Sequence, residues 1–458
     1  MPIATVNPAT GELVRDFAPH SAAEVEERIA AADAAFAALR GTGFDTRAGW
    51  MRAAADLLEA EAEDVAAMIT LEMGKTLAQA RAEAKKSANA MRFYAEHAEA
   101  FLRGRTLDDP SAVGASAART TYQPLGVVLA VMPWNYPIWQ VVRFAAPALM
   151  AGNTGLLKHA SNVPQAALYL DTLFERGGFP PGSFGSLLIP AGAVEPVIRD
   201  RRVTAVTLTG SEPAGRSVAA IAGSEVKHVV LELGGSDPFI VMPSADLDAA
   251  VATAVTSRTS NNGQACINAK RFIVHDEVYD AFAAKFTAAM AALRVGDPTD
   301  DATDVGPLAT AGGREDLAGL VSDALDNGAV ATTGGQVPDG AGWFYPPTVL
   351  TGIHPGMRLY REEAFGPVAA LYRAADAADA LRIANDTTFG LSSAVWTQDA
   401  AEEELLVTGL DAGAVFVNGM SISYPELPFG GVKDSGVGRE LSAEGIREFC
   451  NLKSVWKA

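Results

Sequence analysis

One cysteine in a glycine-containing turn is the best candidate for a reactive side chain in this sequence. Cys266 is one of two cysteines in 458 residues and lies within 261–270, between an expected amphipathic helix over 246–259 and a short buried strand over 271–274. A loop carried by rigid elements can present a thiolate as a nucleophile. A buried, unreactive thiol is the alternative, because free cysteines commonly pack as small hydrophobic residues.

A carboxylate and an amide are placed to assist such a nucleophile. Glu232 follows a predicted buried strand over 228–231 and precedes two glycines, so a general base with a raised pKa suits the position. Asn135 lies between Pro133 and Pro137, which fix its loop, and its side-chain N–H could donate to a developing oxyanion. The alternatives are an N-cap or salt bridge for Glu232 and an amide that satisfies turn backbone for Asn135.

Two further positions are compatible with an anionic ligand. The stretch 208–215 lies at a predicted strand-to-helix junction, where glycines allow close approach and free N–H groups can meet a pyrophosphate. It lacks the G-x-G-x-x-G pattern, and a plain turn fits it equally well. Lys158 ends another predicted strand, at the edge where open α/β sheets bind ligands, although an ordinary solvated lysine fits there too.

The spacing of the histidines does not support metal chemistry. They are scattered and form neither an HExxH pattern nor a Cys/His ligand set. A cysteine–histidine hydrolase would need one of them beside Cys266, and no spacing indicates this. The six are His20, His97, His159, His228, His275 and His354.

The composition describes a folded, acidic chain. There are 36 Lys and Arg residues against 55 Asp and Glu, and the net charge of -19 argues against nucleic acid or anionic membrane as a partner. A hydrophobic content of 49% allows sizeable cores. Two cysteines cannot form a disulfide framework, and the polar start 1–13 has no signal-peptide core. Because Pro, Asn and Arg interrupt the longest apolar run, 125–157, we expect a soluble cytoplasmic protein.

The order of the predicted elements indicates parallel α/β sheets. A capping box at 21–24 starts a helical opening rich in Ala, Glu and Arg, which we expect to be scaffold. Beyond it, continuous apolar strands alternate with helices, as in parallel sheets covered on both faces. The expected helices are 25–39, 46–60, 62–72, 77–101, 140–150 and 163–175. The expected strands are 119–123, 127–132, 154–157, 186–189, 203–208, 228–231, 239–242, 271–274, 368–372, 391–396, 414–417 and 451–456, the last leaving the core to pair with another subunit or domain.

These motifs, taken in order, resemble the aldehyde dehydrogenase superfamily. Several motifs in one order are far more specific than any one of them, and the resemblance runs from about residue 7 to 456. Within the superfamily the chain most resembles the short bacterial NADP-dependent succinate-semialdehyde dehydrogenases, with Lys-His-Ala-Ser at 158–161. The residues that carry the resemblance are Asn135, Lys158, Gly210, Glu232, Cys266, Glu-Glu-Ala-Phe-Gly-Pro at 362–367 and Pro-Phe-Gly-Gly-Val-Lys-Asp-Ser-Gly at 428–436.

The resemblance implies an aldehyde dehydrogenase-like α/β fold with three parts. A Rossmann-type cofactor domain would comprise 1–106 and 124–235, and an α/β catalytic domain would comprise 236–435. A small β oligomerisation element would comprise 107–123 and 436–458, in a homodimer or homotetramer. The partner would be a small-molecule aldehyde.

The resemblance also assigns roles to individual residues. The Cys266 thiolate would attack the aldehyde, Asn135 and the Cys266 backbone N–H would hold the oxyanion, and Glu232 would activate the hydrolytic water. The cofactor would be NADP rather than NAD, because Ser161 stands where NAD-preferring relatives often have a glutamate that would repel a 2′-phosphate. The cofactor-binding candidates are Trp134, Lys158, Ser161, Gly210, Ser211, Gly215, Leu233, Glu363 and Phe365.

The substrate prediction depends on Arg143, about two helical turns beyond Asn135 at ~3.6 residues per turn. An arginine on this apolar helix needs solvent or an anion, and a clamp for the far carboxylate of succinic semialdehyde is one reading. A structural salt bridge is the other. Some succinate-semialdehyde dehydrogenases have a second arginine six residues before the cysteine, where this chain has Ser260, so Ser423 or Tyr424 is the expected replacement.

Three other functions stay open from the sequence. The substrate could be another aliphatic or aromatic aldehyde. A CoA-acylating dehydrogenase would use the same thiol, but such enzymes typically lack the base that Glu232 supplies. A non-enzymatic relative of the lens-crystallin type would have no need for an intact set of Cys, Glu and Asn.

Overall fold

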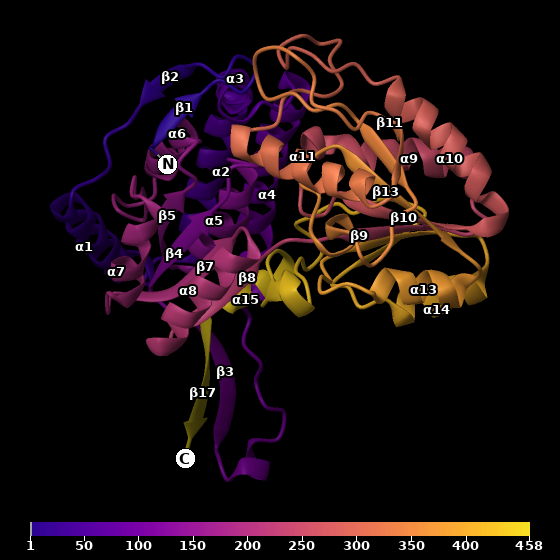
Figure 1. The fold of residues 1–458 in the computed structure, drawn as a ribbon. Helices are drawn as coiled ribbons and strands as arrows, with labels where there is room; N and C mark the ends of the chain where they lie inside the picture. Colours follow the sequence, from indigo (N-terminus) through magenta and orange to yellow (C-terminus); the bar gives the residue numbers. More distant parts are fainter. Residues whose placement is uncertain (1) are drawn as a thin grey trace.

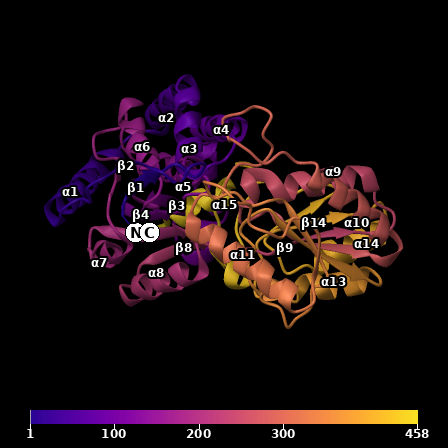
Figure 2. The same cartoon turned by 45° about the horizontal axis from the view of Figure 1, so that its top comes forward.

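The computed structural model describes residues 2–458, which form two α/β halves side by side and a ribbon that projects from the first half (Figure 1). The first half holds the N-terminal helices and a six-stranded sheet, and the second holds a seven-stranded sheet. The chain passes from one sheet to the other between Glu232 and Asp237. In both views helix α15 (Ser442–Glu448) lies where the two halves meet (Figures 1 and 2).

The first sheet is parallel apart from one edge strand. Its order is β16 (Gly436–Val437), β8 (His228–Glu232), β7 (Val203–Thr209), β4 (Val127–Met132), β5 (Thr154–His159) and β6 (Phe184–Ser186). Only β16 runs antiparallel to its neighbour. The helices of this half, besides α15, are α1 (Ala22–Leu39), α2 (Phe44–Ala60), α3 (Ala62–Met73), α4 (Leu77–Phe101), α5 (Trp139–Ala151), α6 (Pro164–Arg176), α7 (Val194–Arg199) and α8 (Glu212–Ser224).

Strand β4 shows why the strands of this half are continuously apolar. Val128 and Ala130 pack into a core shared with helices α2 to α6. Val127 and Leu129 point to the opposite face and pack with α1, α7 and α8. Because helices cover both faces, every residue of the strand is buried except Val131, which is half-buried, and no alternation with polar residues is needed.

The second sheet is also covered on both faces. Its order is β11 (Val330–Thr333), β12 (Thr348–Thr351), β13 (Val368–Ala374), β10 (Ala269–His275), β9 (Asp237–Val241), β14 (Ser393–Trp396) and β15 (Val415–Val417). Phe272 of β10 packs with α9 (Leu247–Thr259) and α10 (Asp276–Ala291). Ile273 faces the other way, towards α11 (Ala311–Asp326), α13 (Ala377–Asn385) and α14 (Ala400–Gly409) (Figure 2). A short helix, α12 (Arg358–Arg361), completes this half.

Most predicted elements are present with small shifts in their ends. The capping box is confirmed, since Ser21 Oγ accepts from the Glu24 N–H and the Glu24 carboxylate accepts from the Ser21 N–H. The predicted strand over 186–189 is wrong, because β6 ends at Ser186. The next residues are buried, but the Ile189 N–H donates to the Leu187 carbonyl at 2.9 Å, so the chain turns there. The short pair of the largely buried β1 (Ala4–Val6) and the exposed β2 (Leu13–Asp16) was not predicted.

The projecting ribbon is formed by two strands of the same chain. Strand β17 (Cys450–Lys457) pairs antiparallel with β3 (Ala117–Pro124) along its whole length (Figure 1). The expected oligomerisation segment 436–458 is therefore divided. Strand β16 lies on the first sheet and α15 joins the core of the first half, because Ile446 packs there. Only β17 from that segment leaves the body.

Two features are absent from the part of the chain that the structure describes. Between residues 2 and 458, no helix combines the length and apolar character needed to cross a membrane. Within the same residues, no three His, Cys, Asp or Glu side chains are grouped so that they could hold a metal ion.

Candidate active site

The predicted site residues come together at the carboxyl edge of the first sheet. Glu232 is the last residue of β8, and Gly210 and Ser211 follow the neighbouring strand β7. Asn135 lies in the loop after β4, which is the next strand in the sheet. Because parallel strands end at the same edge, residues far apart in sequence become neighbours, as in other open α/β sheets.

The cysteine is presented by a turn with an unusual backbone. Three consecutive residues have positive φ, with 57° at Asn261, 56° at Asn262 and 75° at Gly263. Asparagine tolerates this left-handed region better than most residues. Gly263 is required for a second reason, since a Cβ there would lie 2.4 Å from the Gly366 carbonyl carbon. The turn is held close against the 362–367 segment of the second half.

Side-chain amides hold this turn in place. Asn262 Nδ2 donates to the carbonyls of Gly74 at 2.8 Å and Pro307 at 2.9 Å, and its Oδ1 accepts from the Gly306 N–H at 2.9 Å. Lys270 Nζ donates to the Cys266 carbonyl at 2.6 Å. The position of the cysteine is thus set by contacts from distant segments and not by its neighbours alone.

Cys266 lies on a wall shared by two cavities. The smaller has a volume of about 200 Å³ and the larger about 270 Å³, and both are lined by Gln140 and Cys266. The larger cavity is also lined by Trp134, Asn135, Gly210, Ser211, Leu233, Gly234, Glu363 and Phe365. A thiol in this position can meet one reactant from each side.

Burial raises the pKa of the Cys266 thiol to about 12, while Arg143 and Lys270 oppose the shift. At neutral pH the sulfur is therefore protonated in this structure. Thiolate is the nucleophilic form, so a proton must leave the sulfur before or during attack. Any reaction at this cysteine needs a proton acceptor as well as a substrate.

Asn135 ties its loop to the cysteine turn. Its Nδ2 donates to the Gln264 carbonyl at 3.0 Å, and its own carbonyl accepts from Asn261 Nδ2 at 2.8 Å. The side chain is buried and lines the larger cavity beside Cys266. One N–H of the amide is occupied by Gln264, and the other is free to serve an oxyanion.

Glu232 is buried behind the cavities, and it lines neither of them. Its side chain is 2% exposed, and neither carboxylate oxygen has a hydrogen-bond partner among residues 2–458. Burial and the nearby Glu440 raise its pKa well above the ordinary value, against the effect of Arg143. The raised pKa fits a general base, but the carboxylate has to turn towards Cys266 to reach a water there.

Most cofactor candidates line the larger cavity, and their chemistry fits a nicotinamide nucleotide. The rings of Trp134 and Phe365 meet edge to face at 5.6 Å and offer an apolar surface to a flat ring. Gly215 allows close packing of α8, since a Cβ there would lie 2.5 Å from Leu233 Cδ2. Glu363 lies at the same cavity and pairs with Lys270 at 2.9 Å.

Two cofactor candidates lie one strand further along the sheet. Lys158 is the penultimate residue of strand β5 and Ser161 follows the strand, and neither lines the cavities at Cys266. Burial lowers the pKa of Lys158. Because β5 adjoins β4 in the sheet, both residues border the same carboxyl edge, where the distal part of a long nucleotide would extend.

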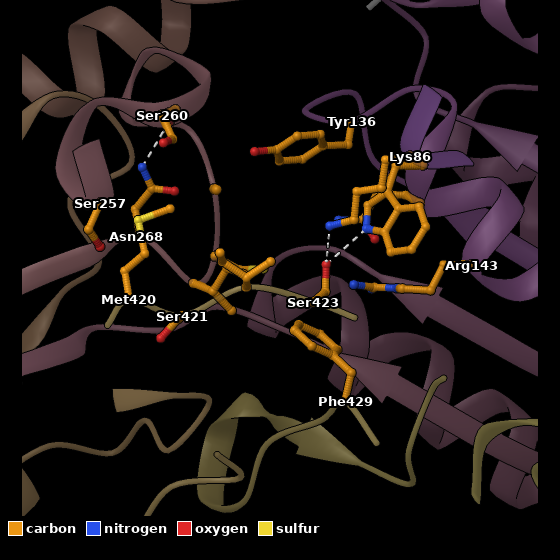
Figure 3. A pocket seen from close by; sticks show the side chains of 16 residues that line it. Lys86, Tyr136, Arg143, Ser257, Ser260, Asn268, Met420, Ser421, Ser423 and Phe429 are labelled. Atoms are coloured by element: carbon orange, nitrogen blue, oxygen red, sulfur yellow. Dashed lines mark hydrogen bonds between the residues drawn. The ribbon is translucent and has the colours of Figure 1, made fainter. Parts of the chain in front are cut away.

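The smaller cavity contains the predicted substrate residues Arg143 and Ser423. Ser423 Oγ accepts from Lys86 Nζ at 2.8 Å and from Trp139 Nε1 at 3.2 Å (Figure 3). Arg143 is 2% exposed, and its guanidinium forms an ion pair with Glu440. Arg143 therefore forms the ion pair of the salt-bridge reading, and it also lines the cavity that the clamp reading requires. Tyr424 lines a neighbouring cavity and not this one.

Comparison with known proteins identifies the chain. The sequence model of the aldehyde dehydrogenase family matches residues 1–455. The chain belongs to this family. Its fold is shared by solved members of the family over nearly the whole chain.

Several relatives of this aldehyde dehydrogenase are similar along nearly their entire length. Succinate-semialdehyde dehydrogenase (NADP(+)) 1 of Mycobacterium tuberculosis is 65% identical over 458 residues, with 100% of both chains covered. The crystal structure of succinic semialdehyde dehydrogenase from Streptococcus pyogenes, in complex with NADP+, has a TM-score of 0.96 at 34% identity, covering 99% of each chain. Succinate-semialdehyde dehydrogenase from Burkholderia pseudomallei has a TM-score of 0.95 at 38% identity, covering 99% of this chain and 94% of that one.

Lys86 of this aldehyde dehydrogenase was not among the predicted site residues. The helical opening was expected to be scaffold, yet the Lys86 side chain of α4 lines the smaller cavity. A signal was present, because Lys86 lies three residues after the buried Glu83 and four before the buried Ala90. Residues at these spacings share one face of a helix, so a lysine there is on the buried stripe.

Proposed function

We propose that this aldehyde dehydrogenase oxidises succinic semialdehyde to succinate with NADP+ as hydride acceptor. The observation that carries the proposal is the position of Cys266 between two different cavities. One has the aromatic surface of Trp134 and Phe365, and the other has the cations Lys86 and Arg143. An aldehyde with a carboxylate at its far end matches the second cavity in charge. The names of the relatives at 65% and 34% identity support this choice.

The proposed first step is addition of the Cys266 sulfur to the aldehyde carbon. The thiol gives its proton to a water molecule, a C–S bond forms, the π bond of the carbonyl breaks, and the carbonyl oxygen becomes an oxyanion. The free N–H of Asn135 and the Cys266 backbone N–H stabilise this oxyanion. Because Gln264 and Asn261 already fix Asn135, the amide need not reorganise as the charge develops.

The proposed second step ends with hydrolysis of a thioester on Cys266. Bound NADP+ would supply the chemistry by accepting the hydride from the former aldehyde carbon. Glu232 then takes a proton from water as the water oxygen attacks the thioester carbon. The C–S bond breaks, the carboxylate leaves, and the sulfur takes the proton that Glu232 received from water. The residues that would hold NADP+ are Trp134, Lys158, Ser161, Gly210, Ser211, Gly215, Leu233, Glu363 and Phe365.

An aldehyde panel with both cofactors tests the proposal. We expect kcat/KM for succinic semialdehyde to exceed that for butanal by at least about tenfold, because one charge-assisted contact is worth ~1.5–3 kcal/mol. The two aldehydes have equal carbon chains and differ in the terminal carboxylate. Equal kcat/KM values would contradict the substrate assignment. A requirement for CoA would instead indicate an acylating dehydrogenase, and no reduction of either cofactor would indicate a non-enzymatic relative.

Ser161→Glu should reverse the cofactor preference. The new carboxylate would repel a 2′-phosphate and accept hydrogen bonds from the ribose hydroxyls of NAD. We expect the ratio of kcat/KM for NADP+ over NAD+ to fall by at least about tenfold. Ser161→Ala is the matched control, since it removes the hydroxyl without adding charge. A wild-type enzyme that already prefers NAD+ would contradict the NADP assignment.

The proposal extends to assembly and location. We propose that the first half binds the cofactor, that the second supplies the nucleophile, and that the ribbon joins subunits into a homodimer or homotetramer. The ribbon exposes large apolar side chains, with Leu452 54% and Trp456 56% exposed. Surfaces of this kind commonly mark interfaces. Both cysteines are free thiols, which fits the reducing cytoplasm.

A further inference from the structure

Two of the three cations in and near the smaller cavity are paired with a carboxylate. The Arg143 guanidinium is paired with the buried carboxylate of Glu440. Lys75 is paired with Glu83 at 2.5 Å, and both side chains are almost fully buried. Glu83 is further engaged by the backbone N–H groups of Ile138 and Trp139, at 2.8 and 3.0 Å. Each of these two cations therefore has a carboxylate of its own.

Lys86 differs because its partners within the described chain are neutral. Its Nζ donates to Ser423 Oγ at 2.8 Å and lies 4.2 Å from the centre of the Trp139 ring. Among residues 2–458 it forms no ion pair. Figure 3 shows the ammonium, the Arg143 guanidinium and the Ser423 hydroxyl converging on one end of the cavity. An ammonium without a counter-ion inside a protein favours binding of an anion.

We propose that Lys86 is the residue that binds the far carboxylate of the aldehyde and so determines substrate preference. The inference rests on the proposed function, because it names the group that recognises the proposed substrate class. Arg143, which pairs with Glu440, lines the same end of the cavity. A cation on a helix of the first half would hold one end of the substrate, while Cys266 meets the other.

Ser423 completes this carboxylate site. Its oxygen already accepts from Lys86 Nζ and from Trp139 Nε1, which occupy both acceptor positions of a hydroxyl. The hydroxyl hydrogen therefore points away from these two donors and is available to an incoming carboxylate. Lys86 and Ser423 can each donate one hydrogen bond, and the Trp139 ring holds the ammonium in place through a cation–π contact.

The test compares three variants on two aldehydes. Lys86→Met keeps the length of the side chain without the charge, and Lys86→Arg keeps the charge. Lys85→Met is the matched control, because Lys85 is the neighbouring lysine on the exposed face of α4. In Lys86→Met we expect the ratio of kcat/KM for succinic semialdehyde over butanal to fall at least about tenfold, with butanal changed by less than about threefold. Lys86→Arg and Lys85→Met should stay near the wild-type ratio.

The pH dependence offers a readout that a structural role would not move. Burial, followed by the charge of Arg143, lowers the pKa of Lys86 to about 8. The other charged and titratable groups facing it are Glu83, Lys75 and Cys266. As pH rises through 8 the ammonium loses its proton, so the KM for succinic semialdehyde should rise there while that for butanal stays level. In Lys86→Arg the KM for succinic semialdehyde should not rise as pH passes 8, because guanidinium stays charged.

Each remaining outcome overturns the inference. An unchanged ratio in Lys86→Met would show that another group binds the carboxylate. Equal loss on both aldehydes would show that Lys86 supports the fold or the thiol. A wild-type enzyme without preference for succinic semialdehyde would remove the proposed function itself, and that result is seen before any variant is made. A selective loss of kcat/KM for succinic semialdehyde in Lys86→Met therefore supports the inference. If that variant keeps the wild-type preference, the inference about Lys86 is refuted and the proposed function is unaffected.

Discussion

Replacing Cys266 with alanine is expected to abolish aldehyde oxidation, with a loss in kcat of at least about 10⁴-fold. The thiol is the nucleophile of the proposed mechanism, and the one other thiol of the chain lies elsewhere. The other cysteine, Cys450, begins strand β17 of the ribbon, where its Sγ contacts the Ile446 carbonyl at 3.4 Å. The substitution removes one small side chain from a turn held by Asn262 and Lys270, so the turn itself should persist.

Two measurements should accompany this variant. Reduction of NADP+ during aldehyde turnover is followed by absorbance, and NADP+ binding is measured by calorimetry. Binding should stay within about threefold of wild type, because the substitution removes only one sulfur from the wall of the larger cavity. Cys450→Ala is the matched control and should retain activity. Turnover by the Cys266→Ala enzyme at a rate near wild type would refute the covalent mechanism.

Replacing Glu232 with glutamine should slow hydrolysis of the thioester far more than hydride transfer. A general base contributes ~10²–10⁴-fold, so steady-state kcat should fall by about that factor. Rapid-mixing experiments should then show a burst of NADPH, close to one per active site, followed by a slow phase. The amide retains the shape of the buried side chain, which is 2% exposed, but it cannot accept a proton from water.

The environment of Glu232 adds a prediction about pH. Burial and Glu440 raise its pKa, so the carboxyl is protonated at low pH and cannot act as a base. The slow step of the wild-type enzyme should therefore accelerate as pH rises through this raised pKa, and the Gln variant should lose that rise. Hydroxylamine, which attacks a thioester without a base, should speed the slow phase of the variant. Uniform slowing without a burst would move Glu232 to an earlier step, such as deprotonation of Cys266.

Much of the fold could be predicted from local patterns in the sequence. Helix 77–101 and strand 127–132 were predicted with their observed ends, because a 3.6-residue period and a continuous apolar run are properties of the segment itself. Strand 186–189 failed for a physical reason. Burial of Leu187 to Ile189 makes the segment apolar, but pairing with a neighbouring strand decides whether it becomes a strand.

By itself, the sequence determined which residues could do the chemistry. Cys266, Glu232 and Asn135 stand at strand ends or in fixed turns, and such positions are visible in the order of residues along the chain. Ser423, which the resemblance suggested as a replacement for a second arginine, lines the cavity at Cys266. Cys266, Glu232 and Asn135 share a signal, since a polar group near glycine, proline or a strand end departs from the surrounding pattern.

Only the tertiary structure decided the charge of the substrate cavity. The sequence favoured Arg143 as the anion-binding group, but folding brings Glu440 from the C-terminal segment against it and balances its charge. Folding also brings Lys86 from the N-terminal helices to Ser423 and leaves it without a carboxylate. A net charge in a cavity is a sum over groups hundreds of residues apart. Electrostatic interaction depends on distance in space, and distance in space is what local sequence patterns do not contain.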